Sequence, residues 1–404
     1  MSAVAFGAPP WDTTVFQKSP PTTTCPPPTA WTTNWIEQEH SLLNDLKQAI
    51  TPYETNHTWE KIKKISNPYE LIYTTESPQF PPSLAIQKPL SRSYFKMIEM
   101  LEVSQFFPML SKQTQTLRSA HVAEGPGGFI EAFCERCSLY KKPLGKSLAM
   151  TLKPNGTNIP GWRRAYNFLQ KHPEVLIHYG RDGTGDIYNL ENQRSFLDNC
   201  PFRVNLFTAD GGFDFSEDYS TQEKNVYPLL LASAKIGLQC LATDGTFIMK
   251  LFDSFGIPTQ YLLRVITLCF REWVLYKPAT SRPCNSERYL IARGFRRCPS
   301  EILSILTQME DRYWSNREYP DLSAQSVPLW SEHEDLYIRN HIESFTKNQC
   351  DTIQNSFQLE HQDIGKVNWS PYIARAHDWC SHFRVADALM GNRGAYRAYG
   401  YTSP

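Results

Sequence analysis

Short apolar runs alternate with amphipathic stretches between Ser91 and about Phe295. The amphipathic stretches predict helices over residues 129–136, 189–199, 226–241 and 259–270, and another that begins at Ser91 or Ser93. Strands that alternate with helices form a mainly parallel sheet through right-handed crossovers. The pattern therefore predicts a doubly wound α/β domain over residues 91–297. The apolar runs are its predicted strands: residues 120–123, 147–152, 175–179, 204–208, 246–251, 273–276 and 288–292.

The last two predicted strands differ from the others because no helix separates them. Only the turn-rich residues 277–287 lie between them. A connection of this kind joins antiparallel neighbours. We therefore expect an antiparallel hairpin at one edge of the sheet.

The regions that flank this domain have different patterns. Residues 1–35 contain seven prolines and eight threonines, which predicts an extended arm. Residues 36–90 form a helical extension, since apolar residues recur at helical spacing from Ile36 to Ile50 before Pro52 interrupts them. Residues 298–404 are expected to be a mostly helical C-terminal extension.

Composition and charge limit the classes of function. The 404 residues include 41 Lys and Arg and 41 Asp and Glu, so a nucleic acid would be bound by a local patch. No apolar run approaches about 18 residues and no leader is apparent, which predicts a soluble intracellular protein without a membrane segment. The ten cysteines lack disulfide or zinc-module spacing, and Cys134 and Cys137 are expected to be ordinary thiols on a helix. We expect no metal site.

A glycine-rich turn follows the first predicted strand of the domain, from His121 to Phe129. In a doubly wound sheet this turn is where a nucleotide-like ligand meets bare backbone. Its glycines permit a positive φ and a close approach. The turn lacks the Gly-x-Gly-x-x-Gly pattern and the Lys-Ser/Thr of a P-loop, so dinucleotides and triphosphates are disfavoured. A tight turn without a ligand is the alternative.

Three ionisable residues stand at strand ends, where polar side chains are unexpected. Asp210 and Lys250 end two predicted strands, and Glu287 begins the last one. Because that last strand is expected to be antiparallel, its start lies at the same edge as the ends of the others. The three groups should converge there. Individually, Asp210 could cap a turn and Lys250 could be an ordinary surface side chain.

Four motifs follow one another in order along the domain: Ser91-Arg-Ser-Tyr-Phe-Lys96, the glycine-rich turn, Thr208-Ala-Asp-Gly-Gly-Phe213 with Gly245-Thr-Phe-Ile-Met-Lys-Leu-Phe-Asp253, and Ser281-Arg-Pro-Cys-Asn-Ser-Glu-Arg-Tyr289. In order and spacing they make residues 91–295 resemble the FtsJ/RrmJ-type ribose 2′-O-methyltransferases, and among them the mRNA cap 2′-O-methyltransferases of eukaryotes and viruses. The resemblance implies a Rossmann-like methyltransferase fold, S-adenosylmethionine as methyl donor, and a catalytic tetrad formed by Lys96, Asp210, Lys250 and Glu287.

The tetrad suits proton removal from a ribose hydroxyl. An exposed lysine is protonated near neutrality, with a pKa of about 10.4. Burial and the nearby ammonium of Lys96 would lower the pKa of Lys250 and let it accept the proton, while Asp210 and Glu287 act in the opposite direction, so the sequence leaves the balance of the four groups open. This chemistry requires no metal.

The resemblance also implies two sets of binding residues. For the donor they are Ser91, Glu124, Gly125, Pro126, Gly127, Gly128, Phe129, Asp186 and Ile187. For RNA they are Ser220, Thr221, Gln222 and Phe255. Phe255 could stack on a base or on a methylated guanine, or it could be a core residue.

The substrate is left with several alternatives. His121 stands where many family members carry Asp, with Glu124 as the nearby acid, a version similar to the cap-2 branch, whereas the Ser281–Tyr289 motif is closer to the cap-1 branch. The leading hypothesis is a cap methyltransferase acting on a first transcribed nucleotide of capped mRNA, with other capping or transcription components as partners. Alternatives are an rRNA or tRNA 2′-O-methyltransferase and a catalytically silent RNA-binding capping subunit. A viral protein would act in the cytoplasm or virion, and a nuclear location stays open.

Overall fold

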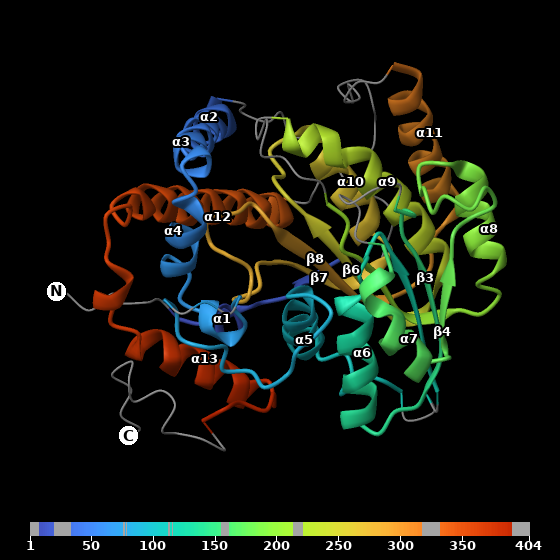
Figure 1. The fold of residues 1–404 in the computed structure, drawn as a ribbon. Coiled ribbons are helices and arrows are strands. Elements are labelled where there is room, and N and C mark those ends of the chain that lie inside the picture. The colour runs from blue at the N-terminus through green and yellow to red at the C-terminus, as the bar shows by residue number, and fades with distance from the viewer. Residues whose placement is uncertain are drawn as a thin grey trace.

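A computed structural model describes residues 8–19, 34–75, 77, 79–111, 114, 116–154, 161–212, 221–316 and 332–389, with the backbone alone for residues 34–39 and 332. These residues form an eight-stranded sheet in the order β1-β7-β8-β6-β5-β2-β3-β4 (Figure 1). The strands are β1 (Gln17–Lys18), β2 (Leu117–Val122), β3 (Leu144–Met150), β4 (Val175–His178), β5 (Val204–Ala209), β6 (Leu241–Leu251), β7 (Phe270–Tyr276) and β8 (Arg288–Phe295).

The sheet is mixed, and the predicted α/β class is confirmed. Strands β4, β3, β2, β5 and β6 are parallel neighbours, while β8 pairs antiparallel with both β6 and β7. All seven predicted strands are present, and the expected β7–β8 hairpin is confirmed. The structure adds β1, which pairs antiparallel with β7 through two residues.

Helices cover the sheet and build both extensions. In Figure 1 the N-terminal helices α2 and α4 lie beside α12, so the N-terminal and C-terminal extensions pack against each other. The helices are α1 (Pro10–Thr13), α2 (Asn34–Gln48), α3 (Thr51–Thr55), α4 (Trp59–Ile65), α5 (Ser93–Val103), α6 (Gly128–Leu139), α7 (Tyr166–Lys171), α8 (Leu190–Asp198), α9 (Gln222–Cys240), α10 (Ile257–Thr267), α11 (Ser300–Asn316), α12 (Glu332–Phe357) and α13 (Ser370–His382).

The arm expected to be extended contains α1 and β1 in its described residues 8–19. Residues 1–7 and 20–33 of the arm lie outside the described residues. A two-residue edge strand satisfies the constraint that prolines impose, because it needs few backbone donors.

The flanking extensions share cores with the central domain. Leu43 of α2 and Ile338 of α12 belong to the same buried cluster as Phe207 of β5. Trp379 of α13 joins a second cluster with Phe95 of α5. The divisions at residues 35/36, 90/91 and 297/298 stay predictions, and the packing crosses them.

Candidate active site

The four residues of the expected tetrad meet at the carboxyl edge of the sheet. Asp210 directly follows β5, Lys250 is the last residue but one of β6, and Glu287 directly precedes β8. These three strands are neighbours in the order β5-β6-β8. Lys96 arrives from α5, which begins at Ser93 and turns its apolar side chains into the core. The sheet order therefore brings together groups that are 191 residues apart in the sequence, from Lys96 to Glu287.

The side chains form one network of alternating charge. Lys96 Nζ lies 2.6 Å from Glu287 Oε1 and Lys250 Nζ lies 3.0 Å from Asp210 Oδ1. A longer contact of 3.8 Å joins Lys250 Nζ to Glu287 Oε2 and links the two pairs. The four side chains are between 9% and 13% exposed, so a hydroxyl can reach them while most water is excluded. Ion pairs this sheltered act strongly on one another.

The charges in this network decide the protonation state of Lys250. Burial acts to lower the pKa of Lys250, but Asp210 and Glu287 outweigh it and raise that pKa above its ordinary value. For Glu287, burial is outweighed by Lys96 and Lys250, which hold the pKa of this carboxyl well below its usual range. Burial therefore acts in the expected direction, but the two carboxylates that face the ammonium outweigh it, and the balance that the sequence left open falls toward a raised pKa of Lys250.

Tyr289 is a residue of the site to which the sequence assigned no role. It is fully buried, and its hydroxyl donates to Asp210 Oδ1 at 2.7 Å. Tyr289 is the register partner of Lys250 in the β6–β8 ladder. This pairing could have indicated the role of Tyr289, because a tyrosine paired with Lys250 across the ladder lies within reach of the carboxylate that Lys250 contacts.

The loop that carries Glu287, residues 277–287, is fixed by buried carboxylates. Glu99 of α5 accepts from the backbone N–H of Ala279 at 2.7 Å, from Trp379 Nε1 of α13 at 2.9 Å, and from the Tyr276 hydroxyl. Because Glu99 lies one turn after Lys96, the same helix supplies a tetrad residue and the support of the loop. The C-terminal extension therefore takes part in positioning the site.

The N-terminal extension holds the same loop from the other side. Glu70, which is fully buried, accepts from Arg282 Nη2 of the loop at 2.9 Å and lies 3.3 Å from Arg92 Nη1. Arg92 Nε in turn donates to the carbonyl oxygen of Thr280 at 3.1 Å. Burial acts to raise the pKa of Glu70, but the two guanidinium groups lower it. A single carboxylate thus joins the extension, the start of α5 and the loop.

The glycine-rich turn between β2 and α6 is tightly packed. Gly127 has φ +103° and its N–H donates to the Glu124 carbonyl at 2.7 Å. A Cβ on Gly128 would lie 2.3 Å from Ser91 Oγ, and one on Gly211 would lie 2.9 Å from the Ala123 Cβ. The turn therefore adjoins both the start of α5 and the segment that follows Asp210.

Several of the residues expected to bind the donor are buried beneath the turn. The Glu124 carboxylate contacts His121 Nδ1 at 3.1 Å and also accepts from the Thr208 hydroxyl. His121 fills the position where the resemblance leads one to expect Asp, and its Nε2 lies 2.8 Å from Ser119 Oγ. Phe129 and Ile187 are core residues. Their side chains therefore support the turn and its neighbouring loop from below.

Other residues expected to bind the donor lie at the surface of this edge. Gly125 and Pro126 are partly exposed at the carboxyl end of β2. Asp186 is half-buried in the loop after β4, and its Oδ1 accepts from the Tyr188 N–H at 2.9 Å. One carboxylate oxygen of Asp186 is thus engaged by a hydrogen bond within its own loop.

Of the residues expected to contact RNA, two are buried and one lies outside the described residues. Ser220 lies outside the described residues. Gln222 is buried in the first turn of α9, and Thr221 precedes it. Phe255 is 5% exposed and its ring stacks on His40 at 4.6 Å, so it is a core residue and does not present a free face to a base. The core alternative, which the sequence left open for Phe255, describes this position.

A group of potential metal ligands occurs elsewhere. Among the described residues, Cys134, His172 and Glu174 place one ligand atom each within 4.8 Å of one another. They belong to α6 and to the segment that enters β4, and none of them is a tetrad residue. Burial raises the pKa of the Cys134 thiol, which opposes the thiolate that a metal would bind.

Comparisons with known proteins identify a family and several relatives that this chain resembles. A family model described as FtsJ-like methyltransferase matches residues 89–295. The Cap-specific mRNA (nucleoside-2′-O-)-methyltransferase 1 of Xenopus laevis is 32% identical over 295 residues, which are 67% of this chain and 32% of that protein. The Cap-specific mRNA (nucleoside-2′-O-)-methyltransferase 2 of Danio rerio is 32% identical over 282 residues, or 67% of this chain and 36% of that protein. The Homo sapiens methyltransferase 1 is 36% identical over 195 residues, or 46% of this chain and 22% of that protein.

The chain spans about a third or less of the length of these curated relatives. In the part of the chain that the structure describes, each helix is too short or too polar to cross a membrane.

Proposed function

Because the chain belongs to the FtsJ-like methyltransferase family, we propose that it transfers a methyl group from S-adenosylmethionine to a ribose 2′-hydroxyl of RNA. The proposed substrate is the capped 5′ end of mRNA, methylated on a first transcribed nucleotide. Relatives named as cap-specific methyltransferases 1 and 2 are both 32% identical over 67% of the chain, which supports this substrate. The observation that carries the proposal is the network of Lys96, Glu287, Lys250 and Asp210 at the carboxyl edge of the sheet.

Lys250 is the proposed base. Its Nζ would accept the proton of the 2′-hydroxyl, so the ribose oxygen can attack as an alkoxide-like nucleophile. Asp210 orients the Lys250 side chain, with Tyr289 holding the same carboxylate. Because Asp210 and Glu287 raise the pKa of Lys250, its own proton must leave first, and this step favours higher pH.

Lys96 and Glu287 are proposed to position the ribose relative to Lys250. Glu287 contacts both ammonium groups and can also accept from a sugar hydroxyl. Lys96 Nζ keeps two N–H groups beyond its bond to Glu287, which suit the attacking oxygen. Positioning of this kind supplies a large part of the rate of a two-substrate reaction.

The donor residues are proposed around the glycine-rich turn. The turn begins at the end of β2, where Ala123 lies beside Gly211 of the segment that follows Asp210, and a Cβ on Gly125 would lie 2.8 Å from the Gly161 carbonyl oxygen. Asp186 offers its second carboxylate oxygen to a nucleoside hydroxyl. Bound S-adenosylmethionine would supply the methyl group on a sulfonium, whose positive charge also opposes protonation of Lys250.

Two other functions compete with this one. An rRNA or tRNA 2′-O-methyltransferase would use the same four side chains on a different RNA. A catalytically silent RNA-binding subunit would keep the fold and has no chemical need for all four of them. The cap assignment is favoured by the similarity to cap-specific relatives.

The deciding experiment measures methyl transfer to one short RNA with and without a methylated cap, at physiological salt. With equal numbers of basic and acidic residues the chain has no general attraction for RNA, so a specific anchor such as the cap should dominate. We expect a much higher rate on the capped RNA. Equal rates on both, or a preference for ribosomal fragments, would contradict the cap assignment, and transfer to none of them would contradict the enzyme.

A further inference from the structure

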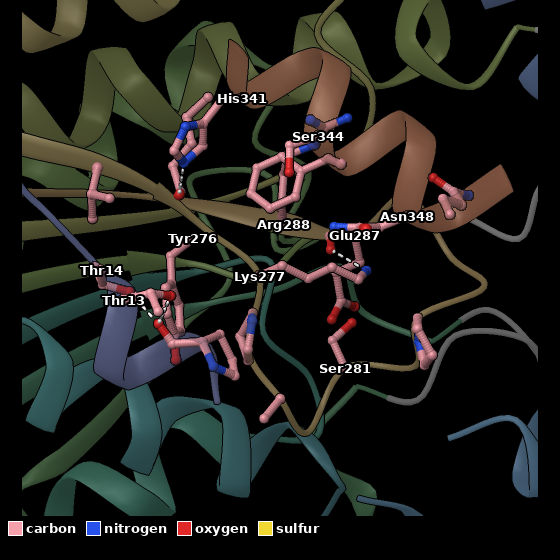
Figure 2. Close-up of a pocket in the computed structure, with 18 of the residues that line it drawn as sticks. Thr13, Thr14, Tyr276, Lys277, Ser281, Glu287, Arg288, His341, Ser344 and Asn348 are labelled. Atoms are coloured by element: carbon pink, nitrogen blue, oxygen red, sulfur yellow. Dashed lines mark hydrogen bonds between the residues drawn. The ribbon is translucent and has the colours of Figure 1, made fainter. Parts of the chain in front are cut away.

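A cavity of about 470 Å³ adjoins the tetrad at the β7 and β8 side of the sheet (Figure 2). Its volume falls in the range of about 300–1,000 Å³ that is usual for ligand pockets. The loop 277–287 and the start of β8 form one wall, α12 forms a second, and Thr13 and Thr14 of the N-terminal arm form a third. Glu287 both lines this cavity and contacts Lys96 and Lys250, so the cavity borders the tetrad at this residue.

The lining combines aromatic, amide and cationic groups. Tyr69, Tyr337 and Phe345 contribute rings, and Asn348 contributes an exposed amide. Two of the rings also have a protein partner, since Tyr337 packs on His341 at 4.2 Å and Phe345 on the Arg288 guanidinium at 5.0 Å, and the Gln349 amide donates to the Cys284 carbonyl oxygen. RNA bases are recognised by stacking on aromatic rings and by hydrogen bonds to their edges. The cavity therefore offers the groups that recognise a base.

The cations of the lining are Lys277 and Arg288, and they differ in what they can offer a ligand. Lys277 Nζ is engaged, since it donates to both oxygens of Asn285 and to the carbonyl oxygen of Glu287. Arg288 is 2% exposed and its Nε donates to the Phe252 carbonyl at 2.7 Å. Its buried Nη1 has no hydrogen-bond partner among the described residues. A buried donor without an acceptor is unfavourable, and an oxygen of a ligand would satisfy it.

The position of the cavity separates it from the donor site. In the strand order, the glycine-rich turn follows β2 on one side of β5 and β6, and the cavity lies at β8 and β7 on the other side. The tetrad is between them. A ligand in the cavity can therefore approach the tetrad while the donor side stays free.

We propose that this cavity binds a nucleotide of the substrate RNA, next to the nucleotide whose ribose lies at the tetrad. The inference rests on the proposed function, because it takes the RNA to be the substrate. The chemistry is an aromatic base linked to phosphate, and it is shared by the cap guanosine and a transcribed nucleotide.

The test fills the cavity with an indole ring. Ser344 of α12 is exposed, lines the cavity and lies outside the tetrad. We expect Ser344→Trp to weaken RNA binding, measured by fluorescence anisotropy of a labelled RNA, and to raise the KM for RNA by about tenfold or more, a change of about 1.4 kcal/mol. Affinity for S-adenosylmethionine should be unchanged. Glu343→Trp, at an exposed neighbouring position that does not line the cavity, is the matched control.

Capped and uncapped RNA distinguish the two sources. An effect on capped RNA alone assigns the cavity to the cap guanosine, and an effect on both assigns it to a transcribed nucleotide. Asn348→Leu, which removes an amide without adding bulk, provides a second variant with the same expected direction. Unchanged RNA binding and KM in both variants would overturn the inference. Loss of RNA binding in Ser344→Trp, with no methyl transfer by the unmodified protein, would support the cavity and reject the proposed function.

Discussion

Lys250 and Tyr289 are partners across the β6–β8 ladder, and both contact the same oxygen of Asp210. Asp210 Oδ1 therefore receives an ammonium at 3.0 Å and a phenol hydroxyl at 2.7 Å. Because Tyr289 is fully buried, it cannot turn to water, and it fixes the carboxylate against which Lys250 is held. The proposed base is thus oriented by a backbone register as well as by its charge partners.

The first prediction concerns the proposed base itself. Lys250→Ala should abolish methyl transfer and leave the affinity for S-adenosylmethionine nearly intact, because Lys250 acts on the hydroxyl and not on the donor. Lys250→Arg should fail as well, since a guanidinium stays protonated and cannot accept a proton. A radiolabelled methyl-transfer assay and donor calorimetry give the two readouts. Activity within a few-fold of the unmodified protein would reject Lys250 as the base.

The pH dependence of the rate provides a second prediction. Burial acts to lower the pKa of Lys250, and Asp210 and Glu287 raise it by more, so the amine is charged at neutral pH. The single-turnover rate should therefore rise by about tenfold per pH unit until the pH reaches that pKa. Glu287→Gln removes one of the raising charges, so the ascending limb should move to lower pH while the maximal rate falls.

The control for this profile is Glu343→Gln, which changes an exposed carboxylate outside the tetrad. It should leave the limb in place. A limb that stays at the same pH in Glu287→Gln would show that Glu287 does not act on the titrating group.

A third prediction tests the glycine-rich turn. Gly127→Val should remove donor binding, because Gly127 has φ +103° and its Cβ would lie 3.0 Å from the Trp162 ring. The left-handed conformation alone costs about 1–3 kcal/mol for such a residue, so the free energy of unfolding should also fall. Gly294→Val in β8 is a matched control, since Gly294 has φ +69° and its Cβ would lie 3.2 Å from the Arg271 side chain of β7. The control variant should lose stability but bind S-adenosylmethionine as well as the unmodified protein does. If Gly127→Val binds the donor as well as the control does, the donor site is not at the glycine-rich turn.

The sequence predicted the strands and their convergence well for a simple reason. Apolar runs mark buried parallel strands, and the carboxyl ends of such strands meet at one edge whatever the loops do. Asp210, Lys250 and Glu287 could therefore be expected to lie together. The predicted start of β6 is five residues too late, since the strand begins at Leu241. Its first residues follow α9 directly and have a polar pattern typical of a turn, so no sequence signal indicates that they belong to the strand.

The supporting contacts could not be predicted in this way. Glu99 and Glu70 are buried carboxylates whose partners lie far along the chain, such as Trp379 and Arg282. A buried polar residue in an apolar helix has no periodic signal that names its partner. The pairing of β1 with β7 joins residues about 250 positions apart through two residues, which is too short for any local pattern. The pKa of Lys250 depended on distances that only the assembled site defines.

The last prediction tests whether the C-terminal extension acts on the site through the loop. Glu99 Oε1 accepts from the Tyr276 hydroxyl and the Ala279 N–H, and Oε2 accepts from Trp379 Nε1. Glu99→Gln keeps the shape of the side chain but replaces one of these oxygens with an NH₂ group, so the donors on that side lose their acceptor. Buried donors left without an acceptor cost about 1–3 kcal/mol each, so the free energy of unfolding should fall by about that amount. Because the loop ends at Glu287, a shift of the loop should move Glu287 away from Lys96 and Lys250. The rate of methyl transfer should therefore fall, while the affinity for S-adenosylmethionine is retained. Glu102→Gln on the same helix is the control, since Glu102 contacts Tyr140 and Arg384 and not the loop. If denaturant unfolding and single-turnover rates change equally in the two variants, the effect belongs to the helix as a whole and the loop is not held through Glu99.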